Sequence, residues 1–387
     1  MGRRWHLAVL SLIGFVTSFG AHVVAVNLPV YAREVGVGLA VIGLLIAVYD
    51  FAEVLAKPVF GYVADKRGKK VTLLLGLGVF SVASASFLLV DPRLLILVRL
   101  LQGLGAAAFS VISLSLVAEY FAEGRGRAYG VYNAAKGAGY VVSPAVGGAI
   151  VWATDFRAIF AVSFAIGLAA LLLALTLPEP ARAAGWEDDD DLSVREFLLA
   201  FANQTLLPWY GIIVVNMFLA SILFGFLPVY ASSLGYDQLL VGALTALATL
   251  SYLVVQPLAG LAADRAAPAR TVMLGLLVAS LGIVALPFAT GWTLTAVVVA
   301  AGLGVGTVWT NTDTLVSRLV ARSALAAGIG AAGSFKEIGD MVGPLAVGVL
   351  AQAVGLRAGF VLCGALSLAG LLAVGRRAWS ARAALAD

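Results

Sequence analysis

Residues 57–70 have the sequence KPVFGYVADKRGKK, in which an apolar segment ends in a basic turn. The basic side chains of this turn are Lys66, Arg67, Lys69 and Lys70. Gly61 lets a neighbouring backbone come close, Asp65 places a carboxylate near the end of the segment, and Gly68 permits a tight reversal. Apolar sequence resumes directly after the turn. The stretch therefore predicts a short charged loop between two long apolar helices.

The whole chain is too apolar for a soluble domain. It has 387 residues, of which 61% are hydrophobic and 12% charged, with 43 glycines. Apolar runs of about 20 residues, the length that crosses about 30 Å of hydrocarbon, recur along it. We therefore predict an all-α integral membrane protein with twelve transmembrane helices. Their expected bounds are 7–30, 38–64, 71–90, 94–120, 128–152, 156–178, 207–232, 240–263, 271–290, 292–316, 324–354 and 356–376.

The distribution of basic residues indicates the orientation in the membrane. Of the 25 Lys and Arg, seventeen lie at the termini or in even-numbered loops and four lie in odd-numbered loops. The positive-inside rule then predicts a multi-pass protein of the cell (cytoplasmic) membrane with both termini in the cytoplasm. The net charge of +4 reflects this topology, so no nucleic-acid partner is expected. The single Cys363 allows no intrachain disulfide and no thiolate metal cluster.

Three patterns recur along the chain at a constant offset of 199 or 200 residues. They are LPVYA at 28–32 and 227–231, Pro58, Gly61 and Asp65 with Pro257, Gly260 and Asp264, and Pro144 and Gly148 with Pro344 and Gly348. A constant offset at three places indicates that a six-helix unit was duplicated, which predicts two pseudo-symmetric six-helix bundles. The expected parts are an amino-terminal bundle (1–178), a cytoplasmic linker with a short interfacial helix (179–206) and a carboxy-terminal bundle (207–387).

Three motifs resemble those of the major facilitator superfamily, and specifically of its twelve-helix drug/proton antiporters. Residues 61–70 are similar to the family's loop motif between helices 2 and 3. Residues 99–105, RLLQGLG, resemble the motif with a buried arginine implicated in proton coupling. Residues 139–148, GYVVSPAVGG, resemble the glycine-proline motif of antiporters, although Ser143 stands where the family usually has glycine. The duplicated twelve-helix plan extends this resemblance over the whole chain.

The resemblance implies a gating role for the first and third motifs. Asp65 is expected to pair with a basic residue of the loop and with the positive end of the eleventh helix, which holds the inner side closed. A simpler alternative is that the loop only fixes topology through its positive charge. The second copy of the motif, at 260–270, loses most of the basic turn, so the first copy is the better gate candidate. The candidate gating residues are Gly61, Asp65, Arg67, Gly68, Lys69, Lys70, Asp264, Pro144 and Gly148.

Ionisable residues inside the predicted helices are candidates for proton coupling, because a charged group in hydrocarbon costs a few kcal/mol or more. They are Asp50, Glu53, Arg99, Lys336, Glu337 and Asp340; Asp313 is a further ionisable residue, near the inner end of the tenth span. Asp50 and Glu53 share one helix face with Lys57. The resemblance makes helices 2 and 11 neighbours, so a buried network between these acids and Lys336 is expected. Such a network could carry protons or could only set the register of the two bundles.

Aromatic and polar side chains are expected to line the substrate pathway on helices that line the cavity in this superfamily. The candidates are Asn27, Tyr49, Tyr132, Asn133, Lys136, Tyr140, Phe224, Tyr252 and Trp309. Aromatic walls suit large, flat or cationic drug-like substrates. Lys136 could attract an anionic substrate, exchange places with a proton, or pair with an acid of the other half. His22 could titrate near neutral pH or remain a hydrogen-bonded neutral imidazole.

The sequence thus predicts a proton-coupled exporter (antiporter), active in multidrug efflux of small amphipathic or drug-like molecules by alternating access. The chain has no GxxxxGK[ST] motif, so no nucleotide or other cofactor is expected. The alternative within transporters is a symporter or facilitator for a nutrient or organic anion, suggested by Lys136 and Lys336. An enzyme would need ligands or nucleophiles that two His and one Cys hardly supply. The expected partners are a small-molecule substrate, protons and the lipid bilayer, with the protein as a monomer.

Overall fold

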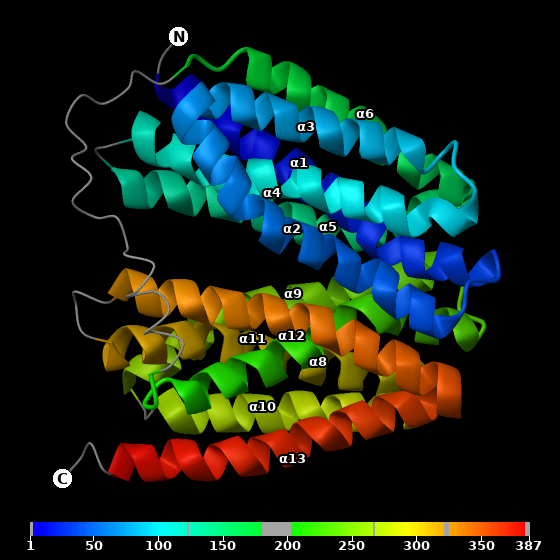
Figure 1. Cartoon of the computed structure of the whole chain (residues 1–387). Helices are drawn as coiled ribbons and strands as arrows, with labels where there is room; N and C mark the ends of the chain where they lie inside the picture. Colours follow the sequence, from blue (N-terminus) through cyan, green and yellow to red (C-terminus); the bar gives the residue numbers. More distant parts are fainter. Residues whose placement is uncertain (1–2, 122–123, 180–202, 266–267, 321–324, 384–387) are drawn as a thin grey trace. The chain divides into compact units, whose positions relative to one another are not determined.

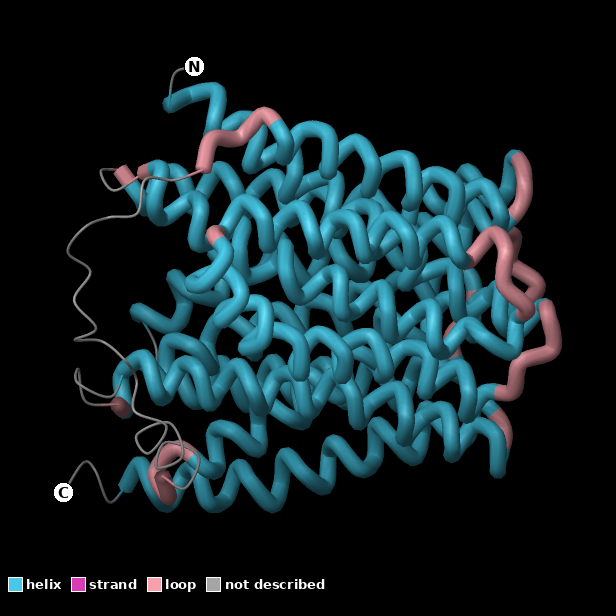
Figure 2. The backbone as a smooth tube through the Cα atoms, turned by 45° about the horizontal axis from the view of Figure 1, so that its top comes forward, coloured by secondary structure: helices cyan, strands magenta, loops and turns pink. Residues whose placement is uncertain are grey.

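Long helices joined by short loops make up the computed structural model, which describes residues 3–121, 124–179, 203–265, 268–320 and 325–383. Within these ranges, every long regular element is an α-helix (Figure 2). The first six are α1 (Arg3–Glu34), α2 (Leu39–Arg67), α3 (Lys69–Ser86), α4 (Leu95–Tyr120), α5 (Arg125–Ala153) and α6 (Phe156–Leu175). The next six are α8 (Leu207–Ser233), α9 (Gln238–Arg265), α10 (Pro268–Ala285), α11 (Gly291–Leu319), α12 (Leu325–Val354) and α13 (Leu356–Ala383). Short 3-10 turns, η1 (Pro92–Leu94) and η2 (Leu286–Phe288), precede α4 and follow α10.

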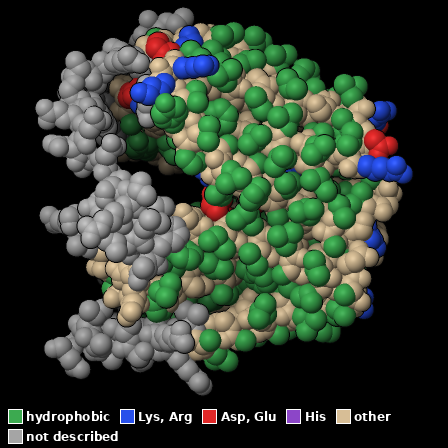
Figure 3. Space-filling view, in the orientation of Figure 1, with side chains coloured by type: hydrophobic (Ala, Val, Ile, Leu, Met, Phe, Trp, Pro, Cys, Tyr) green, Lys and Arg blue, Asp and Glu red, His purple; other side chains and the backbone are tan. Residues whose placement is uncertain are grey.

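These helices confirm the predicted all-α membrane fold, since each predicted span corresponds to one of them. Eleven helices of the described part are long and apolar enough to cross a membrane. The remaining one, α5, is less apolar because it carries Lys136, several glycines and two arginines in its first turn. Hydrophobic side chains are spread over the whole described part of the visible face, and charged side chains gather mainly at its two ends (Figure 3).

The chain divides into two compact units. The first contains residues 1–183 and 231–246, and the second contains residues 184–230 and 247–387. This division differs from the predicted bundles in giving the start of α9 to the first unit. The expected linker helix within 179–206 lies almost wholly outside the described residues.

In the first unit, α1 packs against α5 and α6, α4 packs against α2 and α3, and α3 also packs against α6 (Figure 1). The core between them is apolar, with Leu10, Leu73, Phe80 and Leu116 fully buried. In the second unit, α10 packs against α11 and α13, and α12 against α13. Burial of apolar faces between neighbouring helices therefore positions the polar side chains of each unit.

Close helix contacts at glycines occur at equivalent positions in the two halves of the sequence, as the predicted duplication requires. At several glycines an added Cβ would collide with the backbone of a neighbouring helix. Each of these glycines has a counterpart 199 or 200 residues later, and a Cβ on the counterpart would collide with the equivalent backbone in the other half. The contacts and their counterparts are Gly76–Gly105 with Gly275–Gly304, Gly103–Tyr49 with Gly302–Ala248, and Gly139–Phe15 with Gly339–Val214. Equivalent positions in the two halves can therefore be compared residue by residue.

Candidate functional site

Arg99 lies in the interior of the first unit, on α4, with 4% of its surface exposed. Its Nη1 donates a hydrogen bond to Gln102 Oε1 at 2.6 Å, and its guanidinium carbon lies 4.1 Å from the centroid of the Tyr49 ring. It also interacts electrostatically with Asp50 and Glu53 of α2. Among the described residues, its buried Nε has no hydrogen-bond partner. An amide oxygen and an aromatic face thus hold this cation beside the acids of α2.

A chain of buried hydrogen bonds fixes Gln102, the partner of Arg99. Gln102 Nε2 donates to Ser84 Oγ at 3.4 Å, and the Ser84 hydroxyl lies 3.1 Å from that of Ser163. The Ser163 hydroxyl donates to the carbonyl of Gly20 at 2.9 Å. The chain joins α4, α3, α6 and α1, so the orientation of Arg99 depends on four helices. The serines of this chain could not be selected from the sequence, because serine is common in membrane helices and only tertiary packing aligns these two.

On α2, Glu53 pairs with Lys57 one helical turn away, with 3.0 Å between Oε1 and Nζ. The side chains are 17% and 31% exposed, respectively. This pair agrees with the predicted common face of the charged residues of α2. The expected link from these acids to Lys336 would join the two units, and it stays a prediction.

Three groups from α1 and α5 meet near Arg99. His22 Nδ1 lies 3.0 Å from the carbonyl oxygen of Ser18, which can only accept, so Nδ1 carries the hydrogen. The His22 ring meets the Tyr140 ring edge to face, with centroids 4.1 Å apart. Lys136 Nζ lies 5.8 Å from the centroid of the same Tyr140 ring. His22 also interacts electrostatically with Arg99 and Lys136, so these residues form one cluster.

The other substrate-binding candidates of the first unit differ in position. Tyr132 is 2% exposed and Asn27 is 3% exposed, whereas Asn133 is an exposed residue of α5. The Asn27 side-chain amide donates to the carbonyl of Val23 at 2.8 Å, one turn earlier on α1. A Cβ at Gly147 would lie 2.5 Å from this amide nitrogen, so Asn27 fills the contact between α1 and α5.

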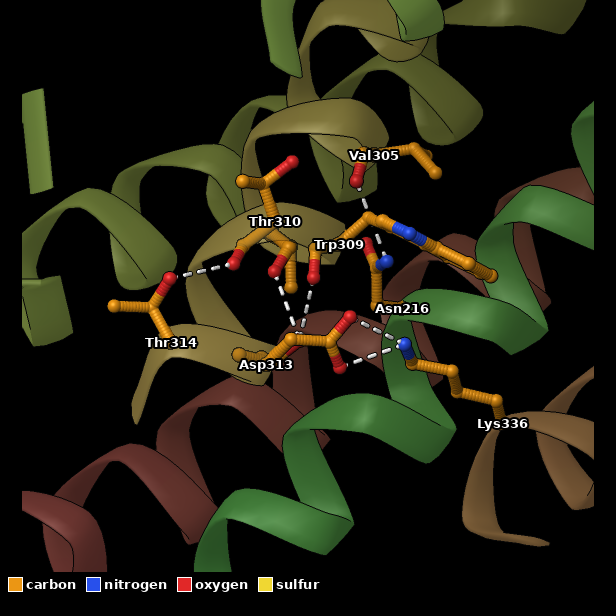
Figure 4. A network of polar contacts seen from close by, with 9 residues as sticks. Asn216, Val305, Trp309, Thr310, Asp313, Thr314 and Lys336 are labelled. Atoms are coloured by element: carbon orange, nitrogen blue, oxygen red, sulfur yellow. Dashed lines mark hydrogen bonds and ion pairs between the residues drawn. The ribbon is translucent and has the colours of Figure 1, made fainter. Parts of the chain in front are cut away.

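In the second unit, Lys336 of α12 and Asp313 of α11 point toward each other (Figure 4). Lys336 Nζ lies 2.7 and 2.8 Å from the two carboxylate oxygens. The same ammonium lies 4.1 Å from the centroid of the Trp309 ring, one turn before Asp313. The side chains of Lys336 and Asp313 are 15% and 46% exposed. The sequence predicted an acid of the second span as the partner of Lys336 and missed Asp313, because sequence alone does not show which faces of α11 and α12 meet.

The aromatic candidates of the second unit form a row. The Phe224 and Tyr252 rings have centroids 5.7 Å apart, and those of Tyr252 and Trp309 are 5.9 Å apart. These rings come from α8, α9 and α11. Trp309 is the last ring of the row, and the Lys336 ammonium lies over its face. Two further candidates, Glu337 and Asp340, are half-buried on α12.

Comparison with known sequences places this architecture in a family. The pattern of the Major Facilitator Superfamily matches residues 10–247, and it matches residues 209–380 a second time. The chain belongs to the major facilitator superfamily. It is a multi-pass membrane transporter and not an enzyme.

Relatives of this superfamily member include resistance proteins. The methylenomycin A resistance protein of Bacillus subtilis (strain 168) is 38% identical over 117 residues, which cover 30% of this chain and 25% of that protein. The quinolone resistance protein NorA of Staphylococcus aureus is 26% identical over 178 residues, 45% of this chain and 46% of that protein. The chain thus spans less than half the length of the curated relatives that it matches here. A solved structure of a point mutant of nucleoside transporter NupG shares the fold, with a TM-score of 0.83 and 14% identity over 97% of this chain and all (100%) of that one.

The loop after α2 in this superfamily member ties the first unit together at one end. Gly68 has φ 97°, which confirms the predicted glycine-dependent reversal. Lys69 pairs with Glu119 at the end of α4, and Lys70 Nζ donates to the carbonyl of Leu175 at 2.9 Å, at the end of α6. Both lysines therefore neutralise helix ends of their own unit.

Of the remaining gating candidates, Gly148 makes a close helix contact within the described part of the chain and Gly61 does not. The expectation of a close backbone approach at Gly61 is wrong for the described residues, because a Cβ there would meet no atom within 4 Å. Gly148, by contrast, packs against the start of α9 in the same unit, where its Cβ would lie 2.9 Å from Gly242 Cα. Pro144 lies inside α5 one turn before Gly148. The side chains of Asp65 and Asp264 lie outside the described part, so their pairing stays a prediction.

Replacement of Asp313 by asparagine is expected to destabilise the second unit. The change leaves the Lys336 ammonium without its counter-ion inside the membrane, which costs roughly 3–5 kcal/mol for a buried pair and less here, because Asp313 is partly exposed. We expect a lower melting temperature of the purified protein in detergent, and partial recovery in the double variant Asp313→Asn, Lys336→Gln, which removes both charges. Equal melting temperatures of the wild type and Asp313→Asn would show that the ion pair contributes nothing to stability.

Proposed function

We propose that this transporter is a proton-coupled exporter of small amphipathic molecules, working as an antiporter by alternating access. The observation that supports it best is the cluster of ionisable groups on α2 and α4, where Arg99 lies on Tyr49 beside Asp50 and Glu53. Ionisable groups at membrane depth are expensive and are retained mainly where they carry ions or protons. The resistance proteins among the relatives favour export of drug-like molecules.

The Glu53 pair offers a way to couple a proton to movement of α2. While Glu53 is ionised, its carboxylate attracts Lys57 on the same face. A proton on Glu53 removes this attraction and lowers the negative charge beside Lys57 and Arg99. The protonated and ionised forms of Glu53 therefore favour different surroundings for α2. Such a difference is what allows a bound proton to shift the equilibrium between two conformations of the transporter.

Substrate contacts are supplied by aromatic rings in both units. Tyr140 beside Lys136 is the candidate in the first unit, and the row of Phe224, Tyr252 and Trp309 is the candidate in the second. Flat apolar molecules gain from stacking on such rings, and each ring pair contributes roughly 0.5–1.5 kcal/mol beyond its buried area.

Purified protein in proteoliposomes with an acidic lumen and trapped pyranine tests the proposal. An antiporter lets protons leave as an external substrate enters, so addition of a transported compound makes the lumen more alkaline. We would test a quinolone, the aromatic cation ethidium and an aromatic carboxylate. Acidification of the lumen on addition would indicate symport, and movement of the compound without a proton signal would indicate a facilitator.

The variants Asp50→Asn and Glu53→Gln are expected to abolish the proton signal while the protein stays folded and inserted. Each amide keeps the shape of the acid and cannot take up and release a proton in this pH range. Glu34→Gln is the matched control, because Glu34 is an exposed acid at the end of α1. If both site variants kept full proton-coupled transport, the assignment of the proton site to α2 would be withdrawn.

The second candidate function is symport or facilitated transport of a nutrient or organic anion. It is favoured by Lys136, a cation at membrane depth whose neighbours are mainly phenol and imidazole groups. The direction of the proton signal described above separates it from export.

The proposal includes the membrane location, the orientation of the termini and the oligomeric state. The protein lies in the cell membrane with both termini in the cytoplasm, and it works as a monomer whose partners are substrate, protons and lipid. Fluorescent and phosphatase fusions at each terminus test the orientation, and light scattering of the purified protein tests the monomer. A phosphatase-active fusion at either terminus, or a dimer mass, would contradict the corresponding part.

A further inference from the structure

Lys136 and Lys336 occupy equivalent positions of the duplicated design. They are separated by 200 residues, as are Gly139 and Gly339 on the same two helices, α5 and α12. The two glycines pack against equivalent positions of α1 and α8, so the register of the comparison is set by backbone contacts. The surroundings of the two lysines can therefore be compared directly, although each lies in its own unit.

The second lysine is neutralised within its unit and the first is not. Lys336 has both oxygens of Asp313 at hydrogen-bond distance and Trp309 beneath it. The offset of 199 residues that relates Gly105 on α4 to Gly304 on α11 makes Leu114 the counterpart of Asp313. The first unit thus has an apolar side chain where the second has the carboxylate.

Other groups around Lys136 do not replace that carboxylate. Its neighbours include the phenol groups of Tyr140 and Tyr132. The carboxylate that acts on it is Glu53, and Glu53 is itself in contact with Lys57 at 3.0 Å. Within the described ranges, no carboxylate oxygen comes within ion-pair distance of Lys136 Nζ.

The other members of the cluster around this lysine, His22 and Arg99, bring no carboxylate. His22 interacts with both Lys136 and Arg99, and it adds no negative charge. A half-buried ammonium at membrane depth without a counter-ion is unfavourable, and an anion that reaches it regains that free energy. The Tyr140 hydroxyl adds a hydrogen-bond donor, and its ring offers a face for an apolar group.

We propose that Lys136 and Tyr140 form an anion subsite that binds the carboxylate of an amphipathic aromatic substrate. His22 is a positioning residue, because its ring holds the Tyr140 ring edge to face while its Nδ1 is bonded to Ser18. The substrate class is then aromatic carboxylic acids, including zwitterions, rather than simple organic cations. This inference rests on the proposed function only in taking the bound molecule to be the transported one.

Equilibrium binding to the full-length protein in detergent, without any proton gradient, tests the subsite. The probes share one ring system: 2-naphthylacetate, the neutral 2-naphthylacetamide and the cationic 2-(2-naphthyl)ethylamine, each titrated by calorimetry. We expect the carboxylate to bind at least about 10-fold more tightly than the amide, and the amine to bind most weakly. Equal affinity of the acid and the amide for the wild type would overturn the proposal.

Three variants make the test specific to Lys136. Lys136→Gln should remove the preference for the acid, and Lys136→Glu should reverse it in favour of the amine. Leu114→Asp installs the acid that the second unit has, so it should neutralise Lys136 and also remove the preference. As the control, Arg93→Gln deletes an exposed positive charge in the 3-10 turn η1 and should keep the preference of the wild type. A preference for the acid that persisted in either Lys136→Gln or Leu114→Asp would overturn the proposal.

The positioning role of His22 has its own readout. His22→Gln should weaken binding of the acid and of the amide by the same factor, because the ammonium remains and only the ring of Tyr140 is displaced. A selective loss of acid binding would instead make His22 a direct ligand and contradict the positioning role.

Failure of this test and failure of the export proposal are distinguishable. A protein that prefers the acid but shows no proton signal in proteoliposomes would refute antiport and support the subsite. A proton signal with no preference for the acid would refute the subsite and leave antiport in place.

Discussion

Replacement of Arg99 by methionine is expected to lower proton-driven transport by on the order of 100-fold, because breaking a buried charge cluster costs roughly 3 kcal/mol. The change removes the cation that interacts with Asp50 and Glu53 and leaves Gln102 Oε1 without its 2.6 Å donor. The Tyr49 ring also loses the guanidinium that lies 4.1 Å from its centroid. The measurement is the initial rate of the pyranine signal in proteoliposomes, with a compound that the wild type moves.

A lysine at position 99 gives a finer test of the same site. Lysine keeps the charge but cannot donate to Gln102 and cover the Tyr49 ring with one planar group. We expect Arg99→Lys to retain more transport than Arg99→Met but less than the wild type. Arg157→Met is the control, because Arg157 is an exposed arginine at the start of α6. Transport by Arg99→Met at the rate of the wild type would remove Arg99 from the coupling machinery.

Valine in place of Gly76 is expected to be strongly destabilising. Its Cβ would overlap the Cβ of Ala108 and lie 3.0 Å from the carbonyl oxygen of Gly105 on α4. Overpacking of this kind costs about 1–3 kcal/mol, and more where backbone has to move. We expect a clear fall in the melting temperature measured by size-exclusion chromatography after heating.

Gly78 supplies the matched control for this prediction. It lies two residues later on the same helix, and a Cβ there would meet no atom within 4 Å. Gly78→Val introduces the same β-branched side chain into α3, so any difference between the variants reports packing and not helix propensity. Equal melting temperatures of the two variants would mean that α3 and α4 are not packed as closely as the structure has them.

Much of the fold was predictable because it depends on local sequence. A run of about 20 apolar residues must satisfy its backbone hydrogen bonds internally, so each run predicts one helix without knowledge of the others. The duplication was predictable because three patterns recur at an offset of 199 or 200 residues. The structure adds equivalent backbone contacts at glycines with the same offset, such as Gly103 and Gly302. The reversal at Gly68 was also predictable, because this glycine lies in the basic turn between two apolar runs.

The candidate site was predictable only in part. The shared face of Glu53 and Lys57 follows from helical spacing, and the buried arginine follows from its motif. The close approach expected at Gly61 was wrong, because a small residue permits a contact without requiring one. The serine chain that fixes Gln102 could not be foreseen, since its members lie on four helices whose rotations are not local properties.

The sequence by itself determined the helices, their duplication and the identity of the charged residues at membrane depth, because these follow from composition and spacing along one chain. Only the tertiary structure decided which of those charges are neutralised. Lys136 and Lys336 hold equivalent places in the sequence, yet Lys336 meets Asp313 whereas Lys136 has Leu114 at the corresponding position. The physical reason is that an ion pair requires two side chains from different helices within about 4 Å, and the rotation of each helix about its axis is set by packing against all its neighbours.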